Sequence, residues 1–288
     1  MPEPSLNHRL REEAERISAG LPPLLAAAER LASTVHLGVH GRRKAGMGET
    51  FWQFRRYRAE DPAQAVDWRQ SAKSQHLFVR EREWEAAEAV WFWRDGSAGM
   101  RFSSSKDVES KIDRASLLAL ALASLLVRGG ERIALLGEGR TPSSGRAALS
   151  RVAYALGETE STLPPAQPMT RHPQFVWLSD FLSPLDALEA AMRKLSREGV
   201  RGHLVQIIDP AEEDFPFAGR TRFEMGREHE TLGRAETIAP AYRARFKAHS
   251  ESVAALARRL GWSMMVHRTD QRPELALVAL YADLAAPR

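Results

Sequence analysis

Short apolar runs alternate along the chain with longer amphipathic stretches. The short runs are rich in aromatic and β-branched residues and end at small or polar residues, which is typical of buried strands. The longer stretches repeat apolar residues every three or four positions, which is typical of helices that pack by one face. Strands are expected near residues 88–94, 132–136, 175–178, 203–208 and 262–267, a surface hairpin near 221–235, helices near 117–127, 184–195, 240–260 and 273–284, and a further helix capped by Ser143 or Ser144. This alternation predicts an α/β fold with a doubly wound, mostly parallel sheet.

The N-terminal part of the chain has a different pattern. Residues 8–35 are expected to form one or two helices with an apolar face that packs on the main domain, made of Leu24, Leu25, Ala28 and Leu31. Two strands are expected over residues 51–58 and 76–83, with a short turn between them. We therefore expect an N-terminal helical and β arm over residues 1–85 and a main α/β domain over residues 86–288.

Charge and tryptophan are concentrated in the arm. The whole chain of 288 residues has a formal net charge of +4. The segment from His40 to Arg82 alone carries ten Lys or Arg against five Asp or Glu, and five of the seven Trp fall between Trp52 and Trp93. Such a segment is typical of a surface that contacts a partner.

Several classes of protein are excluded or disfavoured by the totals. The absence of cysteine excludes disulfides, thiol catalysis and cysteine-based zinc sites. The segment from Met1 to Ala14 has no apolar signal-peptide core, and the longest apolar run, residues 117–127, is too short to span a bilayer. We expect a cytoplasmic protein without a transmembrane segment.

A set of short motifs resembles the signature of the domain-of-unknown-function family 58. The matching residues are Gly46, Gly48, Phe51, Arg56-Tyr57, Asp61, Val66-Asp67-Trp68-Arg69, Ser71-Ala72-Lys73, Val79-Arg80-Glu81, Asp95-x-Ser97 and Leu178-Ser179-Asp180-Phe181. The resemblance covers the chain from about Gly41 onward. It implies a von Willebrand A-like fold and a partner, a MoxR-type AAA+ ATPase, with which such proteins are thought to act in protein maturation or stress responses. Other von Willebrand A-like proteins are further candidate partners.

The arm motif is interpreted as structural. It comprises Gly46, Gly48, Phe51, Arg56, Tyr57, Asp61, Asp67, Trp68 and Arg69. Trp68 is expected to be largely buried and to fix the arm to the main domain, with Asp67 bound to Arg56 or to backbone amides. One position departs from the usual family pattern, because Glu60 precedes Asp61 where relatives have Gly.

The loop after the first strand of the main domain resembles a metal site that lacks one ligand. A von Willebrand A site binds Mg²⁺ through an Asp-x-Ser-x-Ser loop, a Thr from a second loop and an Asp at a later strand end. This chain offers Asp95, Ser97 and Asp180, but Gly99 stands in place of the second hydroxyl residue. Thr141 is proposed for the second loop from its position alone. We expect no cofactor here, with weak Mg²⁺ binding as the alternative.

Two surfaces are candidates for partner docking. Doubly wound sheets bind ligands at the carboxyl ends of their strands, which here places Asp95, Ser97, Gly99 and Asp180 at the docking surface. The second surface is the basic group Arg42, Arg43 and Lys44, which would attract an acidic partner. The expected function is a non-enzymatic protein–protein interaction, with no catalytic residues assigned.

Two other functions remain open from the residues. The basic, tryptophan-rich arm has the composition of a nucleic-acid-binding surface, although the family resemblance favours a structural or docking role without nucleic acid. The order Ser97, Asp209, His267 is that of a serine hydrolase, but the nucleophile elbow needs Gly at position 95, where this chain has Asp.

Overall fold

The computed structural model describes residues 24–35, 51–57, 66–74, 76–82, 88–169, 173–225 and 228–286. The chain divides into two compact units. One comprises His40–Ala87, and the other comprises Met1–Val39 together with Glu88–Arg288. The larger, main unit contains the central sheet.

The central sheet has five strands in the order β4-β3-β5-β6-β9, and every neighbouring pair is parallel. The strands are β3 (Ala89–Arg94), β4 (Arg132–Leu135), β5 (Gln174–Ser179), β6 (Arg201–Ile208) and β9 (Ser263–Arg268). The carboxyl ends of parallel strands lie at one edge of a sheet, so the loops after β3, β5 and β6 come together there.

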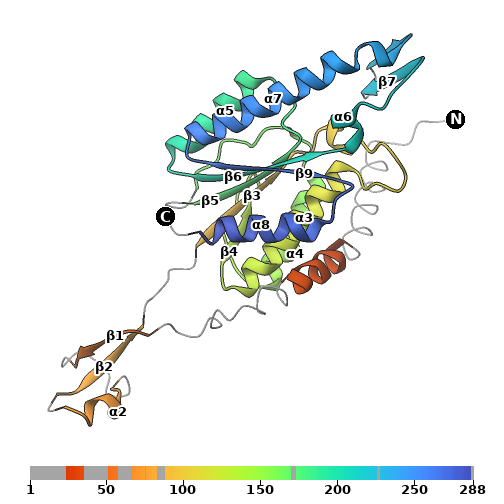
Figure 1. Cartoon of the computed structure of the whole chain (residues 1–288). Coiled ribbons are helices and arrows are strands. Elements are labelled where there is room, and N and C mark those ends of the chain that lie inside the picture. The colour runs from red at the N-terminus through yellow and green to blue at the C-terminus, as the bar shows by residue number, and fades with distance from the viewer. Residues whose placement is uncertain are drawn as a thin grey trace, which may run out of the picture. The chain divides into compact units, whose positions relative to one another are not determined.

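Helices cover both faces of this sheet (Figure 1). On one face lie α3 (Lys111–Arg128), α4 (Arg146–Glu158), α8 (Pro273–Leu284) and the helix of residues 24–35. On the other face lie α5 (Leu185–Arg197) and α7 (Ala239–Arg259). The doubly wound, mostly parallel α/β architecture expected from the sequence is thereby confirmed.

A hydrophobic core lies on each face of the central sheet, and successive side chains of a strand point alternately into one core and the other. In β3, Val90 and Phe92 belong to the core under α3, whereas Trp91 and Trp93 belong to the core under α5 and α7. Because side chains alternate between the faces of a strand, a strand covered on both sides is apolar at every position. This explains why the strands read as uninterrupted apolar runs in the sequence.

The helix of residues 24–35 packs in the main unit through the expected face. Ala28 and Leu31 are buried in the core beside α3, and Leu24 and Leu25 pack against it in part. Smaller elements complete the unit: the 3₁₀ helices η2 (Ala98–Arg101) and η3 (Ala235–Thr237), helix α6 (Pro210–Asp214), and the antiparallel hairpin of β7 (Thr221–Met225) and β8 (Glu228–Leu232).

Two helix starts differ from the sequence-based expectation. Helix α4 begins at Arg146 after Gly145, whose φ of 86° suits glycine, and neither Ser143 nor Ser144 caps it. Ser143 instead forms an antiparallel bridge with Ile133 at the β4 edge. Helix α3 begins at Lys111 with Ser110 as its N-cap, six residues before the apolar run that predicted it.

The smaller unit contains β1 (Phe51–Arg56), α2 (Trp68–Ser71) and β2 (Phe78–Arg82), and its two strands pair in antiparallel fashion. Asp67 caps α2, because its Oδ1 accepts a hydrogen bond from the Gln70 amide at 2.9 Å. Trp68 is 66% exposed, so within this unit the expected burial of Trp68 is wrong. Several predicted residues lie outside the described residues, namely Arg42, Arg43, Lys44, Gly46, Gly48, Glu60 and Asp61.

Candidate functional site

Asp95 lies at the carboxyl end of β3 and is completely buried. Its Oδ1 accepts a hydrogen bond from the Ser97 amide at 2.8 Å, and its Oδ2 accepts one from the Ser179 hydroxyl at 2.7 Å. Burial raises the pKa of Asp95, and the hydrogen bond from Ser179 opposes this effect. The carboxylate therefore joins the β3 loop to the end of β5.

Asp180 follows β5 and is held in place from three sides. Its Oδ1 accepts a hydrogen bond from the Leu182 amide at 3.0 Å, and its backbone carbonyl accepts one from Gln206 Nε2 at 2.9 Å. The next residue, Phe181, has a φ of 54°, a conformation that is uncommon outside glycine. The carbonyl of Phe181 contacts His249 Nε2 at 2.7 Å, so α7 fixes this turn.

The predicted strand-end residues do come together. A Cβ at Gly99 would lie 3.4 Å from Asp180 Oδ2 and 3.9 Å from Ser97 Oγ. A hydroxyl at position 99 would therefore lie close to Asp180 Oδ2. With Gly in that place, no oxygen ligand is available from position 99.

A buried lysine that sequence analysis had not singled out binds that oxygen. Lys111 is the first residue of α3 and is fully buried, and its Nζ donates to Asp180 Oδ2 at 2.9 Å. The same ammonium pairs with Glu212 Oε1 on α6. Burial alone would lower the pKa of Lys111, but Asp180 and Glu212 raise it above its ordinary value, so the amine is a cation at neutral pH.

Glu212 is supplied by a capping box at the end of β6. Asp209 Oδ1 accepts a hydrogen bond from the Ala211 amide, while Glu212 Oε2 accepts one from the Asp209 amide at 2.9 Å. Asp209 Oδ2 also accepts one from the Ser104 amide at 2.9 Å, which connects α6 to the loop after η2. Lys111 is thus the cation shared by carboxylates from two strand ends.

These residues do not fit the Mg²⁺ site that a von Willebrand A-like fold implies. Such a site needs oxygen ligands around a free position for the ion. Here Asp180 Oδ2 is bound by an ammonium, and position 99 has no side chain. Among the described residues, no group of three or more His, Cys, Asp or Glu side chains is arranged to hold a metal ion.

The loop that contains Thr141 does not lie against the Asp95 loop, and the loop after α4 lies there in its place. Thr141 is exposed, and its loop is not the one against Gly96. The Gly96 amide donates to the Ser161 carbonyl at 3.0 Å, and Arg94 donates to the carbonyls of Leu156 and Thr159. The loop after α4 therefore forms the wall beside the Asp95 loop.

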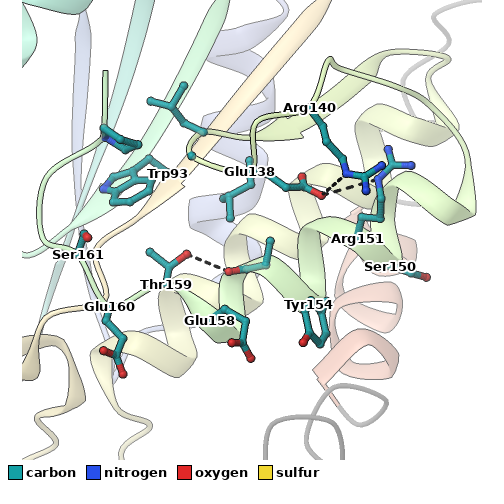
Figure 2. Close-up of a pocket in the computed structure, with 15 residues that line it drawn as sticks. Trp93, Glu138, Arg140, Ser150, Arg151, Tyr154, Glu158, Thr159, Glu160 and Ser161 are labelled. Carbon is teal, nitrogen blue, oxygen red and sulfur yellow. Dashed lines mark hydrogen bonds and ion pairs between the residues drawn. The ribbon is translucent and has the colours of Figure 1, made fainter. Parts of the chain in front are cut away.

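That loop also forms one wall of a pocket of about 810 Å³ at the same edge of the sheet (Figure 2). Trp93 lies on one side of the pocket, and Tyr154 of α4 lies on the other. Glu138 lies 4.0 Å from Arg140 Nε and 3.9 Å from Arg151 Nε, so the rim carries charges of both signs. The pocket makes this edge concave beside the Asp95 loop.

The residues of the hydrolase alternative do not form a triad. Asp209 is committed to the amides of Ser104 and Ala211, and His267 Nε2 contacts Arg114 Nη1 at 3.0 Å. No hydrogen bond joins either of them to Ser97 in the described part of the chain. The Ser-Asp-His order in the sequence therefore has no counterpart in this geometry.

Comparison with known families identifies the chain. The model of the family described as "Protein of unknown function DUF58" matches residues 53–255. The chain belongs to this family. The family model begins within β1 and ends within α7, so it includes both units and the whole Asp95–Asp180 site. The resemblance expected from the motifs is confirmed.

The chain is also similar, at low identity, to bacterial proteins of known sequence and of known structure. Uncharacterised proteins of Mycobacterium tuberculosis and Mycobacterium bovis are each 26% identical to this chain over 286 residues, which covers 89% of this chain and 86% of theirs. An aerotolerance-related membrane protein of Bacteroides fragilis matches with a TM-score of 0.43 at 15% identity, and a conserved hypothetical protein, BatB, of Bacteroides thetaiotaomicron with 0.38 at 14%. Each structural match covers 69% of this chain and 99% of the other. Among the described residues of the present chain, no helix is both long enough and apolar enough to cross a bilayer.

Lys111 could have been found from its position in the helical repeat. It lies four, seven and eleven residues before Ala115, Leu118 and Leu122, which are all buried. A lysine in phase with the buried stripe of a helix needs a carboxylate partner. A cation in the first turn also opposes the helix dipole, which is a second sign that tertiary contacts hold it there.

Proposed function

We propose that this protein is a non-catalytic interaction module that acts as an adaptor for a MoxR-type AAA+ ATPase. The family resemblance supplies the identity of the partner. The strand-end geometry supports the interaction role, because the charged groups of this loop are bound to one another rather than arranged around a reacting group. We therefore place the proposed docking surface for the partner at the carboxyl ends of the strands.

The contact between Lys111 and Asp180 is the observation that carries the proposal. Three loops, those after β3, β5 and β6, meet at this pair and at Glu212. A pre-formed surface binds a partner without the ordering cost that a mobile one incurs. The ion pair therefore supports a rigid recognition surface at this edge of the sheet.

The side chains available to a partner are the exposed neighbours of the buried aspartates. Asp95 and Asp180 are too buried to contact a partner directly, so we assign them the role of positioning the loops. Phe102 is 38% exposed and Leu182 is 41% exposed, and they follow η2 and Asp180 respectively. Large apolar side chains at the centre of an interface contribute most of the binding energy.

The basic group of Arg42, Arg43 and Lys44 is proposed to act before the complex forms. A positive segment accelerates encounter with an acidic partner and loses this effect as salt screens it. Its contribution would be to the association rate, whereas the strand-end surface would set the dissociation rate.

The proposal is tested by direct binding of the purified chain to a purified MoxR-type ATPase from the same organism, in nucleotide-free form. We expect saturable binding that is unchanged when EDTA replaces Mg²⁺. The Asp180→Ala variant should bind more weakly, because Lys111 loses one of its two carboxylates and the β5 turn loosens. A chain that binds only DNA, or that binds no ATPase at any accessible concentration, would contradict the proposal.

A further inference from the structure

Lys111 binds the carboxylate that lies beside Gly99, and this contact does not depend on any partner protein. Its Nζ lies 2.9 Å from Asp180 Oδ2, the oxygen closest to the missing Cβ of Gly99. An oxygen-ligated metal ion bound by this loop would need the Asp180 carboxylate, and it would lack the hydroxyl that Gly99 does not supply. The Lys111 ammonium and such an ion would therefore compete for the Asp180 carboxylate.

We propose that Lys111 is a built-in cation that permanently replaces the divalent metal of this site and closes it to Mg²⁺ and Mn²⁺. Two residues together exchange a bound metal ion for a lysine ammonium, namely Gly99, which has no hydroxyl, and the buried Lys111. The first removes a metal ligand, and the second supplies the positive charge that Asp180 and Glu212 require when buried.

The surroundings of Lys111 explain why the replacement is stable. Ser110 caps α3 and binds Asp113, so the helix start that carries Lys111 is fixed. The Lys111 amide donates to the Phe102 carbonyl at 3.2 Å, which joins the helix start to the end of η2. Lys111 is covalently part of the segment that follows β3, and its ammonium binds carboxylates of the loops after β5 and β6. A chelator therefore cannot remove this cation.

The consequence is a recognition surface that does not respond to divalent metal concentration. In a metal-dependent site, the loops change when the ion leaves. Here the cation belongs to the chain, so the surface stays assembled under all metal conditions. Regulation of any complex at this edge must come from the partner or from another part of this chain.

The test is Mn²⁺ binding followed by electron paramagnetic resonance, together with thermal unfolding in MgCl₂. The wild-type chain should bind no Mn²⁺ saturably at strand-end ligands, and millimolar Mg²⁺ should raise its melting temperature by less than about 1 °C. The Lys106→Ala variant, which removes an exposed lysine of the preceding loop, is the matched control and should behave in the same way.

Removing the internal cation should open the site. We expect Lys111→Ala to melt at a lower temperature without metal and to recover by about 2–4 °C or more in Mn²⁺. Adding Gly99→Ser should strengthen Mn²⁺ binding, and adding Asp180→Asn should abolish it. Lys111→Gln, which keeps most of the side-chain volume, serves if the alanine variant does not fold.

The wild-type chain also provides a measurement that needs no variant. A buried lysine ammonium exchanges its protons slowly and gives a distinct nitrogen-15 resonance, which Mn²⁺ should leave unbroadened. Saturable Mn²⁺ binding by the wild type that is lost in Asp95→Ala, or broadening of this resonance, would overturn the proposal. So would the absence of Mn²⁺ binding in folded variants that lack Lys111.

Discussion

At the scale of single residues, the site depends on Gly96 having no side chain. A Cβ there would lie 2.6 Å from the backbone carbon of Thr159 and 2.7 Å from Glu160 Cα, and backbone atoms cannot move aside as a flexible side chain can. The Asp95 loop and the loop after α4 are therefore in direct contact at this point, and the contact fixes where the Asp95 carboxylate lies.

We predict that Gly96→Ala lowers the free energy of unfolding by at least about 2 kcal/mol, because overpacking forces the two backbones apart. Urea-induced unfolding followed by circular dichroism measures this. Gly233→Ala is the control, since a Cβ at Gly233 meets nothing within 4 Å and its φ is not positive. An equal loss in both variants would show that the two loops are not packed as described.

His267 gives the molecule a defined sensitivity to acid. Burial and the neighbouring Arg114 lower the pKa of His267 to about 4, while Asp270 acts in the opposite direction. Arginine can only donate, so His267 Nε2 accepts from Arg114 and the folded imidazole is neutral. Between about pH 6.5 and 4, only the unfolded chain binds this proton, so stability falls as the pH falls.

We predict that the wild type loses up to about 2 kcal/mol more than His267→Gln between pH 7 and pH 5. Glutamine keeps an acceptor for Arg114 but has no proton to gain. Burial also lowers the pKa of His203, so His267→Gln removes only part of the acid sensitivity. Chemical unfolding at both pH values decides this, and equal losses in the two proteins would contradict the assignment.

At the scale of elements, Trp68 shows where sequence-based reasoning reached its limit. The motif around Asp67 correctly predicted a capped turn, because Asp before a helix start binds a backbone amide locally. Burial of Trp68 depends on contacts far away in the sequence, and no local pattern reports them. The Trp68 side chain is exposed within its own unit.

We predict that Trp68→Ala changes the free energy of unfolding of the main unit by less than about 0.5 kcal/mol, as surface substitutions do. Trp177→Ala, at a fully buried position of β5, should cost about 3–5 kcal/mol in the same assay. Thermal unfolding of both variants separates the two cases. A comparable loss in Trp68→Ala would mean that this side chain packs into a core after all.

The difference between local signals and contacts distant in the sequence also explains which helix starts were predictable. The strands and the helix of residues 273–284 follow from apolar runs and a proline at the helix start, which are local signals. The burial of Lys111 in the first turn of α3 was not predicted, because it depends on Asp180 and Glu212, which lie 69 and 101 residues away. The capping of α4 by Gly145 was missed because serine is the commoner cap.

At the scale of the whole molecule, the expected parallel sheet predicted where the site lies, but it did not predict which cation binds the carboxylates there. The position of Asp95, Ser97 and Asp180 at one edge follows from the parallel order of β3, β5 and β6, which the alternation of elements predicted. The identity of the cation in that place required the structure, because the partners of Lys111, Asp180 and Glu212, lie far away in the sequence. The interaction role remains a proposal that rests on this rigid edge and on the family resemblance.

The most direct test of that role is the binding kinetics of surface variants with the nucleotide-free MoxR-type ATPase. We predict that Phe102→Ser combined with Leu182→Ser raises the dissociation rate at least about tenfold, while Val278→Ser, equally exposed but in the middle of α8, leaves it unchanged. Reversal of Arg42, Arg43 and Lys44 to Glu should slow association and flatten its salt dependence without a change in dissociation. An unchanged dissociation rate in the Phe102 and Leu182 variant, with wild-type folding, would contradict docking at the strand ends.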